Sequence, residues 1–234
     1  FQGSVQVGIY AANYDILEKM LLFLNSVFML ATTPKLIKIY DKSGVKEARN
    51  FNSFIFEIFI SLFLPLAFFI ILNDKLFIST LTDKNYYYGR SLIVLITLSM
   101  LINIVNMYMI KGLTVIKNTK VIAKLYLIAT VVNIVLNIIL IPKFSLYGAI
   151  IATLVCYIAL LAFSVTATKN HRVLTIKYKN SLTQIFVYLI CFLLVDEFFN
   201  YTQKIWVSLL LFPVIFTLIN ITNIKKTKTF LKGN

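Results

Sequence analysis

Charged residues are scarce in this sequence. Only 14% of its 234 residues are charged, whereas 59% are hydrophobic, and the mean hydropathy is +0.86. This composition supplies too little polar surface for a water-soluble globule. The hydrophobic residues also form long continuous runs, which lack the strict alternation of membrane β-strands. Because lipid offers backbone groups no hydrogen-bond partner, we predict an all-α, polytopic membrane helix bundle.

Cysteine, histidine and glycine are also rare. The chain has two cysteines, one histidine and seven glycines. Cys156 and Cys191 lie inside apolar runs, so we expect small hydrophobic residues there and no disulfide. His171 lies in a basic loop, where we expect it to be solvated. The sequence has no Cys/His metal-ligand spacing, phosphate-binding glycine loop or nucleophile elbow, so we do not expect an enzyme.

The apolar runs predict seven membrane-spanning helices, because a bilayer core about 30 Å thick takes ~20 helical residues to cross. Pro34 is predicted to end the first helix, and Pro65 to kink the second. Residues 41–51 are expected to form an amphipathic linker, and residues 73–90 the longest outer loop. The predicted spans are 9–33, 53–72, 91–110, 121–141, 147–167, 181–198 and 205–222.

Lysine and arginine are divided unevenly between alternate loops. Seventeen of the 23 lie after the first, third and fifth spans or in the tail, and five lie in the other loops. Cytoplasmic loops carry such an excess, which predicts a cytoplasmic C-terminus. The formal charge of +14 then indicates contact with anionic membrane lipids and not with nucleic acid. The seventeen are Lys35, Lys38, Lys42, Lys46, Arg49, Lys111, Lys117, Lys120, Lys124, Lys169, Arg172, Lys177, Lys179, Lys225, Lys226, Lys228 and Lys232.

The segments 7-VGIYAANYD and 133-NIVLNIILIPKFSLYGAIIAT resemble bacterial polysaccharide flippases of the multidrug/oligosaccharidyl-lipid/polysaccharide exporter superfamily. The segment 7-VGIYAANYD, with Pro34 further along, resembles their eighth helix. The segment 133-NIVLNIILIPKFSLYGAIIAT is similar to their pattern of two asparagines, an Ile-Pro turn and a Gly-Ala-X-X-Ala-Thr helix start. Ser145 stands where the family commonly has glycine. The resemblance covers nearly the whole chain.

The resemblance implies a position within a larger fold. A flippase of this kind has roughly fourteen helices, built as two repeated bundles plus two extra helices. The seven predicted helices would be the last seven, and the partner would be the missing N-terminal lobe. Residues 1–8, which begin with the tag-like FQGS, would be an outer-side loop or a tag remnant. Residues 9–167 would form the C-terminal lobe, and residues 168–234 two additional helices with a basic tail.

The resemblance also implies a function. The full protein would move undecaprenyl-diphosphate-linked sugar repeat units across the bacterial inner membrane by alternating access. Its partners would be membrane lipids and the lipid-linked oligosaccharide, and it would need no cofactor beyond a coupling monovalent cation or proton. Three alternatives stay open: a multidrug or other small-molecule exporter of the superfamily, a membrane-embedded polysaccharide polymerase or transferase, and an inert half-bundle fragment.

Polar residues inside the spans are the candidates for a substrate cavity, because ionisable groups at membrane depth are costly and usually face water or a partner. Tyr14, Glu18 and Asn25 share one face of the first span. Asn103 and Asn106 on the third span offer similar groups. The alternative for the neighbouring Asp15 and Lys19 is a wet salt bridge near the outer interface.

Asn133, Asn137 and Thr153 are the candidates for a cation site. The two asparagines lie four residues apart, so their amides share a face of the fourth span. Thr153 on the fifth span could meet them across the tight turn, and oxygen donors suit a monovalent cation. The alternative is that these groups only hydrogen-bond neighbouring helices. Gly148 and Ala152 are expected to allow close helix packing.

Overall fold

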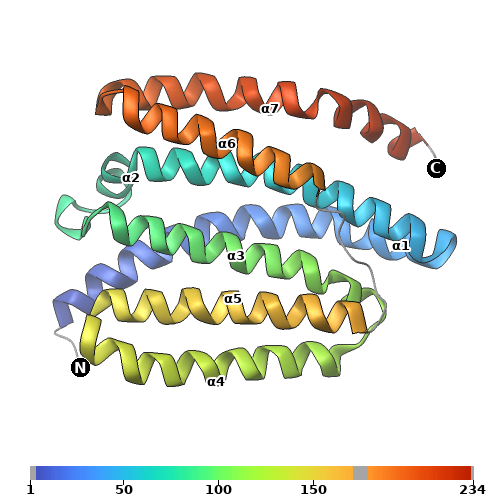
Figure 1. Cartoon of the computed structure of the whole chain (residues 1–234), viewed down its shortest axis with the longest axis horizontal. Coiled ribbons are helices and arrows are strands. Elements are labelled where there is room, and N and C mark those ends of the chain that lie inside the picture. Colours follow the sequence, from blue (N-terminus) through green and yellow to red (C-terminus); the bar gives the residue numbers. More distant parts are fainter. Residues whose placement is uncertain (1–3, 171–178, 233–234) are drawn as a thin grey trace.

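The computed structural model describes residues 4–170 and 179–232, and every regular element in these ranges is helical (Figure 1). The predicted all-α fold is confirmed for this part of the chain. Six of its helices are long and apolar enough to cross a membrane, which makes this a multi-pass membrane protein. His171 lies outside the described residues. The elements are α1 (Ser4–Leu72), α2 (Asp74–Leu81), a 3₁₀-helix η1 (Lys84–Tyr86), α3 (Arg90–Val115), α4 (Thr119–Phe144), α5 (Leu146–Asn170), α6 (Lys179–Phe198) and α7 (Tyr201–Lys232).

Helix α1 contains two of the predicted spans, joined at Gly44. The φ and ψ angles of Gly44 are +79° and −174°, the only non-helical pair inside α1. Glycine adopts this left-handed region at little steric cost. Figure 1 shows the chain reversing its direction within α1. We call residues 4–43 the first arm of α1 and residues 45–72 its second arm.

Several predicted boundaries were wrong. The helix continues through Pro34 instead of ending there, and the expected linker at residues 41–51 is helical on both sides of Gly44. Residues 4–8, expected as a loop or tag remnant, already belong to α1. A proline removes one hydrogen bond, but membrane helices tolerate that loss where neighbouring groups satisfy the freed carbonyl. The tendency of proline to end a helix was therefore outweighed by the need of a membrane helix to satisfy its backbone hydrogen bonds.

The expected outer loop at residues 73–90 contains α2 and η1. A hydrogen bond joins the two ends of this segment: the hydroxyl of Tyr87 donates to Oδ2 of Asp74 at 2.6 Å. Burial and this bond raise the pKa of Tyr87 well above its ordinary value. Asn13 of the first arm also contacts this segment, since its Nδ2 donates to the Tyr86 carbonyl at 2.7 Å. The loop is thus closed on itself by the Tyr87–Asp74 bond and tied to the first arm of α1 by Asn13.

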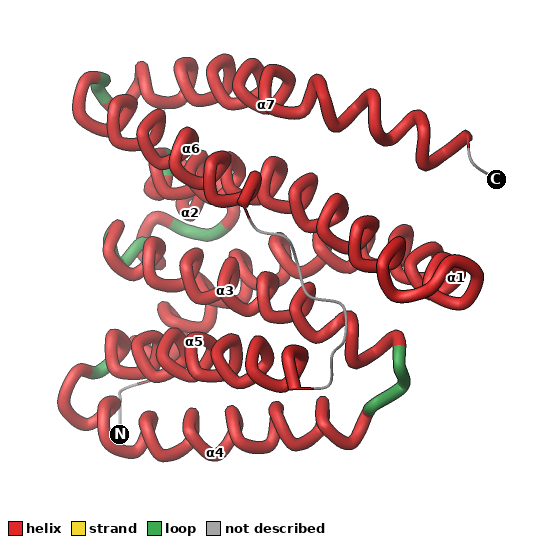
Figure 2. Tube along the Cα trace, turned by 45° about the vertical axis from the view of Figure 1, so that its right-hand side comes forward, coloured by secondary structure: helices red, strands yellow, loops and turns green. Residues whose placement is uncertain are grey.

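Helix α3 lies between α1 and α5, and α4 packs on the far side of α5 (Figures 1 and 2). The main hydrophobic core joins α1, α3, α4 and α5, with Leu17, Phe59, Ile96 and Leu160 among its buried members. Helices α6 and α7 pack against the second arm through a smaller cluster of their own, which includes Tyr188 and Phe212. Exposed apolar side chains on α4, α6 and α7 are expected where helices meet lipid.

The turn between α4 and α5 is as tight as the sequence predicts. Ser145 alone separates the two helices, and its φ of +56° lies in the region that favours glycine. Gly148 is packed so closely that a Cβ there would lie 2.3 Å from the Leu140 carbonyl oxygen. The prediction that Gly148 permits close packing is confirmed, because a larger residue would clash with backbone.

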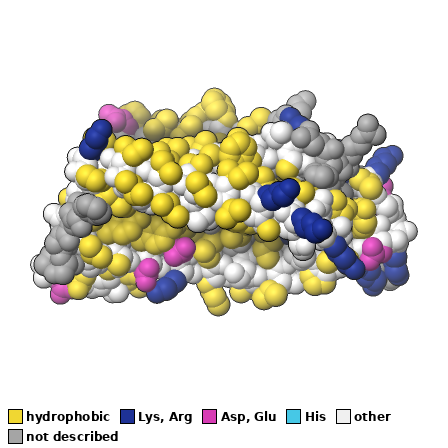
Figure 3. Space-filling view, turned by 90° about the horizontal axis from the view of Figure 1, so that it is seen from below, with side chains coloured by type: hydrophobic (Ala, Val, Ile, Leu, Met, Phe, Trp, Pro, Cys, Tyr) yellow, Lys and Arg dark blue, Asp and Glu magenta, His cyan; other side chains and the backbone are white. Residues whose placement is uncertain are grey.

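The two ends of the bundle differ in charge. The Gly44 bend and the α3–α4 turn lie together at one end, which we call the basic end, and the α4–α5 and α6–α7 turns lie at the other (Figure 1). Lysine and arginine gather toward that same end on the face drawn in Figure 3. One predicted loop lysine was misplaced: Lys111 belongs to α3, and its side chain is 5% exposed.

Candidate functional site

The first arm and α5 meet through a column of polar side chains. The rings of Tyr10 and Tyr14 stack with their centroids 5.5 Å apart. Tyr10 lies beside Thr153 of α5, and Tyr14 lies beside Tyr157. Both helices run in the same direction, so each contact lies one helical turn beyond the previous one. The column is therefore a continuous contact between two helices.

Glu18 extends this column by one more turn. It is half-buried, and within the described ranges its carboxylate has no hydrogen bond or ion pair. Asp15 and Lys19 bond each other at 2.8 Å instead, on the exposed side of the same helix. We call Tyr10, Tyr14, Glu18, Thr153 and Tyr157 the tyrosine–glutamate face. The carboxylate of Glu18 is the only acidic side chain among these five residues.

The chemistry of this face is that of hydroxyls around one carboxylate. Tyrosine hydroxyls donate and accept hydrogen bonds, so they match the hydroxyls of a sugar. A carboxylate with neighbouring hydroxyl oxygens can hold a proton or a hard cation. On the face drawn in Figure 3, acidic side chains lie at the edge of a hollow that is lined by hydrophobic side chains. In the described ranges, no group of three or more His, Cys, Asp and Glu residues could hold a metal ion.

The structure brings predicted residues together in an unexpected combination. Thr153, expected beside Asn133 and Asn137, lies instead beside Tyr10, whose ring stacks on that of Tyr14. Tyr10 and Tyr157 were not singled out from the sequence. The four-residue spacing of Tyr10 and Tyr14 could have pointed to Tyr10, whereas Tyr157 is identified only by the packing of α5 on α1.

Asn25 differs from Tyr14 and Glu18, although it shares their helix face. It is buried, 2% exposed, and its Nδ2 lies 3.3 Å from Sδ of Met107 on α3. Asn103 and Asn106 are also buried in the bundle, and the amide of Asn106 has no partner among the described residues. These three asparagines lie inside the bundle instead of lining an open face.

Asn133 and Asn137 bond each other. The Nδ2 of Asn137 donates to the Oδ1 of Asn133 at 2.9 Å, and both side chains are half-exposed on α4. The hydroxyl of Thr153 donates to the Ala149 carbonyl at 3.0 Å, and in the described part of the chain no hydrogen bond joins it to either asparagine. The structure therefore does not assemble the three predicted cation ligands.

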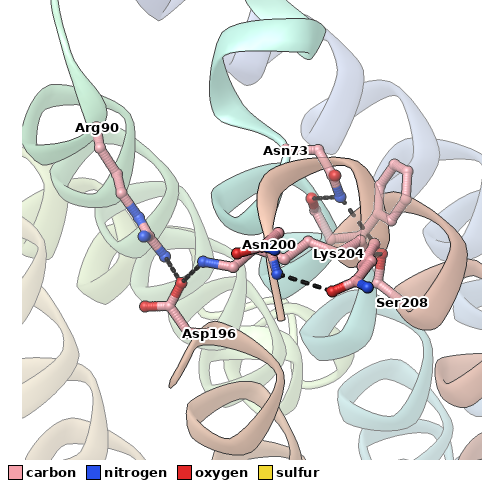
Figure 4. A network of polar contacts seen from close by, with 8 residues as sticks. Asn73, Arg90, Asp196, Asn200, Lys204 and Ser208 are labelled. Carbon is pink, nitrogen blue, oxygen red and sulfur yellow. Dashed lines mark hydrogen bonds and ion pairs between the residues drawn. The ribbon is translucent and has the colours of Figure 1, made fainter. Parts of the chain in front are cut away.

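An ionic network lies at the end of the bundle opposite the basic end (Figure 4). Oδ1 of Asp196 on α6 accepts from Arg90 of α3 at 2.9 Å and from Lys204 of α7 at 2.6 Å. Nearby, Nδ2 of Asn73 donates to the Ser208 hydroxyl at 3.3 Å. These contacts fasten the α6–α7 pair to α3 and to the end of α1, which gives the network a structural role.

A cavity of about 410 Å³ lies between the second arm of α1 and α7. Aromatic, aliphatic and proline side chains make up most of its lining, including Pro65, Phe69, Phe212 and Pro213. It offers few groups for a sugar or an ion, so the tyrosine–glutamate face is the better candidate for a polar substrate.

Comparisons of the chain with protein-family models, with curated proteins and with solved structures give no match.

Proposed function

We propose that this chain forms one lobe of a flippase that moves undecaprenyl-diphosphate-linked sugar repeat units across the bacterial inner membrane by alternating access. The observation that carries the proposal is the tyrosine–glutamate face, a polar column shared by two helices of membrane-spanning length. The segments that resemble polysaccharide flippases include Tyr10 and Tyr14 on one helix of the face and Thr153 on the other. The protein would bind and move its substrate without covalent chemistry.

The position of the face supports this proposal. Tyr157 is eleven residues from Leu146, about 17 Å along α5 at about 1.5 Å per residue, and so near the middle of that 25-residue helix. Tyr14 contacts it there, and Glu18 lies one turn further along. A carboxylate at this depth is costly against hydrocarbon. A water-filled cavity that admits a sugar would relieve that cost.

The partner of this lobe would be a second helical bundle. The side chains of Asp15 and Lys19 are 53% and 75% exposed, respectively, on the first arm. Charged groups within a membrane face protein or water in preference to lipid. A second lobe opposite the first arm would enclose both residues together with Glu18, and the substrate would pass between the two lobes.

We further propose seven crossings with the C-terminus in the cytoplasm. With the reversal at Gly44, each arm of α1 would be a separate crossing, which would add one to the six long apolar helices. The basic end would then face the cytoplasm, in agreement with the distribution of lysine and arginine between the loops.

A second candidate function is export of cationic small molecules. The observation that favours it is the charge of the face: Glu18 is unpaired, and Asp15 is balanced by Lys19, so the net charge there is negative. An acidic cavity suits a cationic drug, whereas a diphosphate needs basic groups, which the second lobe would have to supply.

The test is complementation of a bacterium that lacks its polysaccharide flippase, with surface polysaccharide as the measured quantity. The chain alone should restore none, because alternating access needs two lobes. Joined to the N-terminal lobe of a polysaccharide flippase, it should restore export, and Glu18→Gln should lower export about tenfold or more. Glu47→Gln, on an exposed residue near the Gly44 bend, is the matched control.

Two outcomes would contradict the proposal. Restoration by the chain alone would refute the need for a second lobe. Export of a cationic dye that depends on Glu18, without restoration of polysaccharide, would establish the second candidate function instead.

A further inference from the structure

Lys111 is a buried cation to which the described residues supply no counter-ion. Its Nζ donates to the Thr32 hydroxyl at 3.2 Å and lies 4.6 Å from the centre of the Tyr108 ring. No ion pair to Lys111 occurs in the part of the chain that the structure describes. An ammonium group carries three donors, so two are unused. A buried charge in this condition is strongly destabilising unless something pairs with it.

Further unpaired polar groups lie at the same level of the bundle. The ring of Phe56 on the second arm contacts Tyr108 with centroids 5.9 Å apart. The second arm and α3 run in opposite directions, so one turn toward the basic end from this contact leads to Asn52 on one helix and Lys111 on the other. Asn52 is fully buried, and within the described residues neither of its amide atoms has a partner.

Two more donors complete the set. The hydroxyl of Tyr108 is buried without a partner among the described residues. The same is true of Nε of Arg49, which lies three residues before Asn52 and so on the same side of the helix. Two cations, an amide and two hydroxyls thus lie within about two helical turns of one another on α3 and the two arms of α1, and the aromatic and hydroxyl groups around Lys111 add no negative charge.

We propose that Lys111, with Thr32, Tyr108, Asn52 and Arg49, binds a phosphate-class oxyanion between the two arms of α1. Several N–H and O–H donors around a lysine suit the oxygens of a phosphate group. Lys111 lies four residues, about 6 Å, before the end of α3, close enough to the basic end for entry from that side. The group is an inorganic phosphate or the headgroup of an anionic lipid. This site is separate from the tyrosine–glutamate face and does not depend on the proposed transport.

The test is the thermal unfolding midpoint of the purified full chain. In neutral detergent, sodium phosphate is compared with sodium gluconate at equal ionic strength. In lipid nanodiscs, phosphatidylcholine is compared with phosphatidylcholine containing phosphatidic acid. A ligand at about 100 times its Kd should raise the midpoint by roughly 5–10 °C. Lys111→Met should abolish this rise, and Lys124→Met, on an exposed lysine of α4, should keep it.

Thr32→Val is measured alongside, because Lys111→Met alters the packing as well as the charge. It should reduce the rise while keeping the lysine. Stabilisation by both phosphate and phosphatidic acid would support a general phosphate site, and stabilisation by phosphatidic acid alone would support the lipid headgroup as its source. No stabilisation by either, or an equal rise in Lys111→Met, would overturn the proposal.

Discussion

The hydroxyl of Tyr188 donates a 3.2 Å hydrogen bond to the carbonyl oxygen of Ser61. That carbonyl would normally accept from the amide four residues later in the helix, but residue 65 is proline and has no amide hydrogen. Both Tyr188 and Ser61 are fully buried. Helix α6 therefore supplies the donor that the second arm of α1 lacks, which explains how Pro65 is accommodated inside a continuous helix.

Tyr188→Phe should lower the free energy of unfolding by about 1–3 kcal/mol, because it leaves a buried carbonyl unpaired. In a Pro65→Ala background the same change should cost less, since an alanine at this position restores the helix hydrogen bond. Unfolding in detergent by denaturant measures this double-mutant cycle. Tyr201→Phe, on an exposed tyrosine, is the control. Equal costs in both backgrounds would show that the hydroxyl does not compensate for the proline.

The proposed topology predicts a defined pattern of cysteine labelling. Single cysteines replace the exposed residues Lys42, Asn85 and Lys120 in a chain without Cys156 and Cys191. In intact cells, an impermeant thiol reagent should modify a cysteine at position 85 and spare those at 42 and 120. Labelling at 42 but not at 85 would reverse the orientation. Labelling at 42 together with 85, with 120 protected, would refute two crossings by α1.

Asn133 and Asn137 should behave as a pair. The single change Asn137→Leu leaves the Oδ1 of Asn133 without its donor and should cost about 1 kcal/mol or more. The double change to leucine removes both partners and should cost less, as the site is half-exposed on α4. Unfolding of the three variants tests this order.

The same double variant tests the cation-site hypothesis. If the two amides bind a coupling cation, the complete transporter that carries it should fold but lose its dependence on that ion. We expect ion dependence like that of the wild type, because neutral amides are weak cation ligands without a carboxylate nearby. Loss of ion dependence in a well-folded variant would contradict this expectation.

Asp196→Asn should loosen the α6–α7 pair. It removes the charge that holds both Arg90 and Lys204. These groups are partly exposed, so the expected loss of stability is about 1 kcal/mol and should shrink at high salt. Glu197→Gln changes the adjacent, exposed carboxylate and serves as the control. The salt dependence of the thermal midpoint measures the difference, and equal effects of the two variants would contradict the assigned role.

The sequence alone predicted the helices, because a long apolar run in lipid must satisfy its backbone hydrogen bonds within itself. It also predicted the α4–α5 turn, where Pro142, Ser145 and Gly148 lie within seven residues. These features depend on composition and on neighbours close in sequence. The end of the first helix was harder to predict. A proline favours the end of a helix, but the helix continues through Pro34 and is interrupted at Gly44 instead.

Side-chain partners were decided only by the tertiary structure. Thr153 was expected to meet the asparagines just before it in sequence, yet it meets Tyr10, more than a hundred residues away. Lys111 was expected in a loop and is buried against Thr32 of the first arm. The spacing of residues shows which side chains share a helix face. It does not show which other helix, often far away in sequence, packs against that face. Local pattern carries no information about that partner helix, and the packed core fixes it.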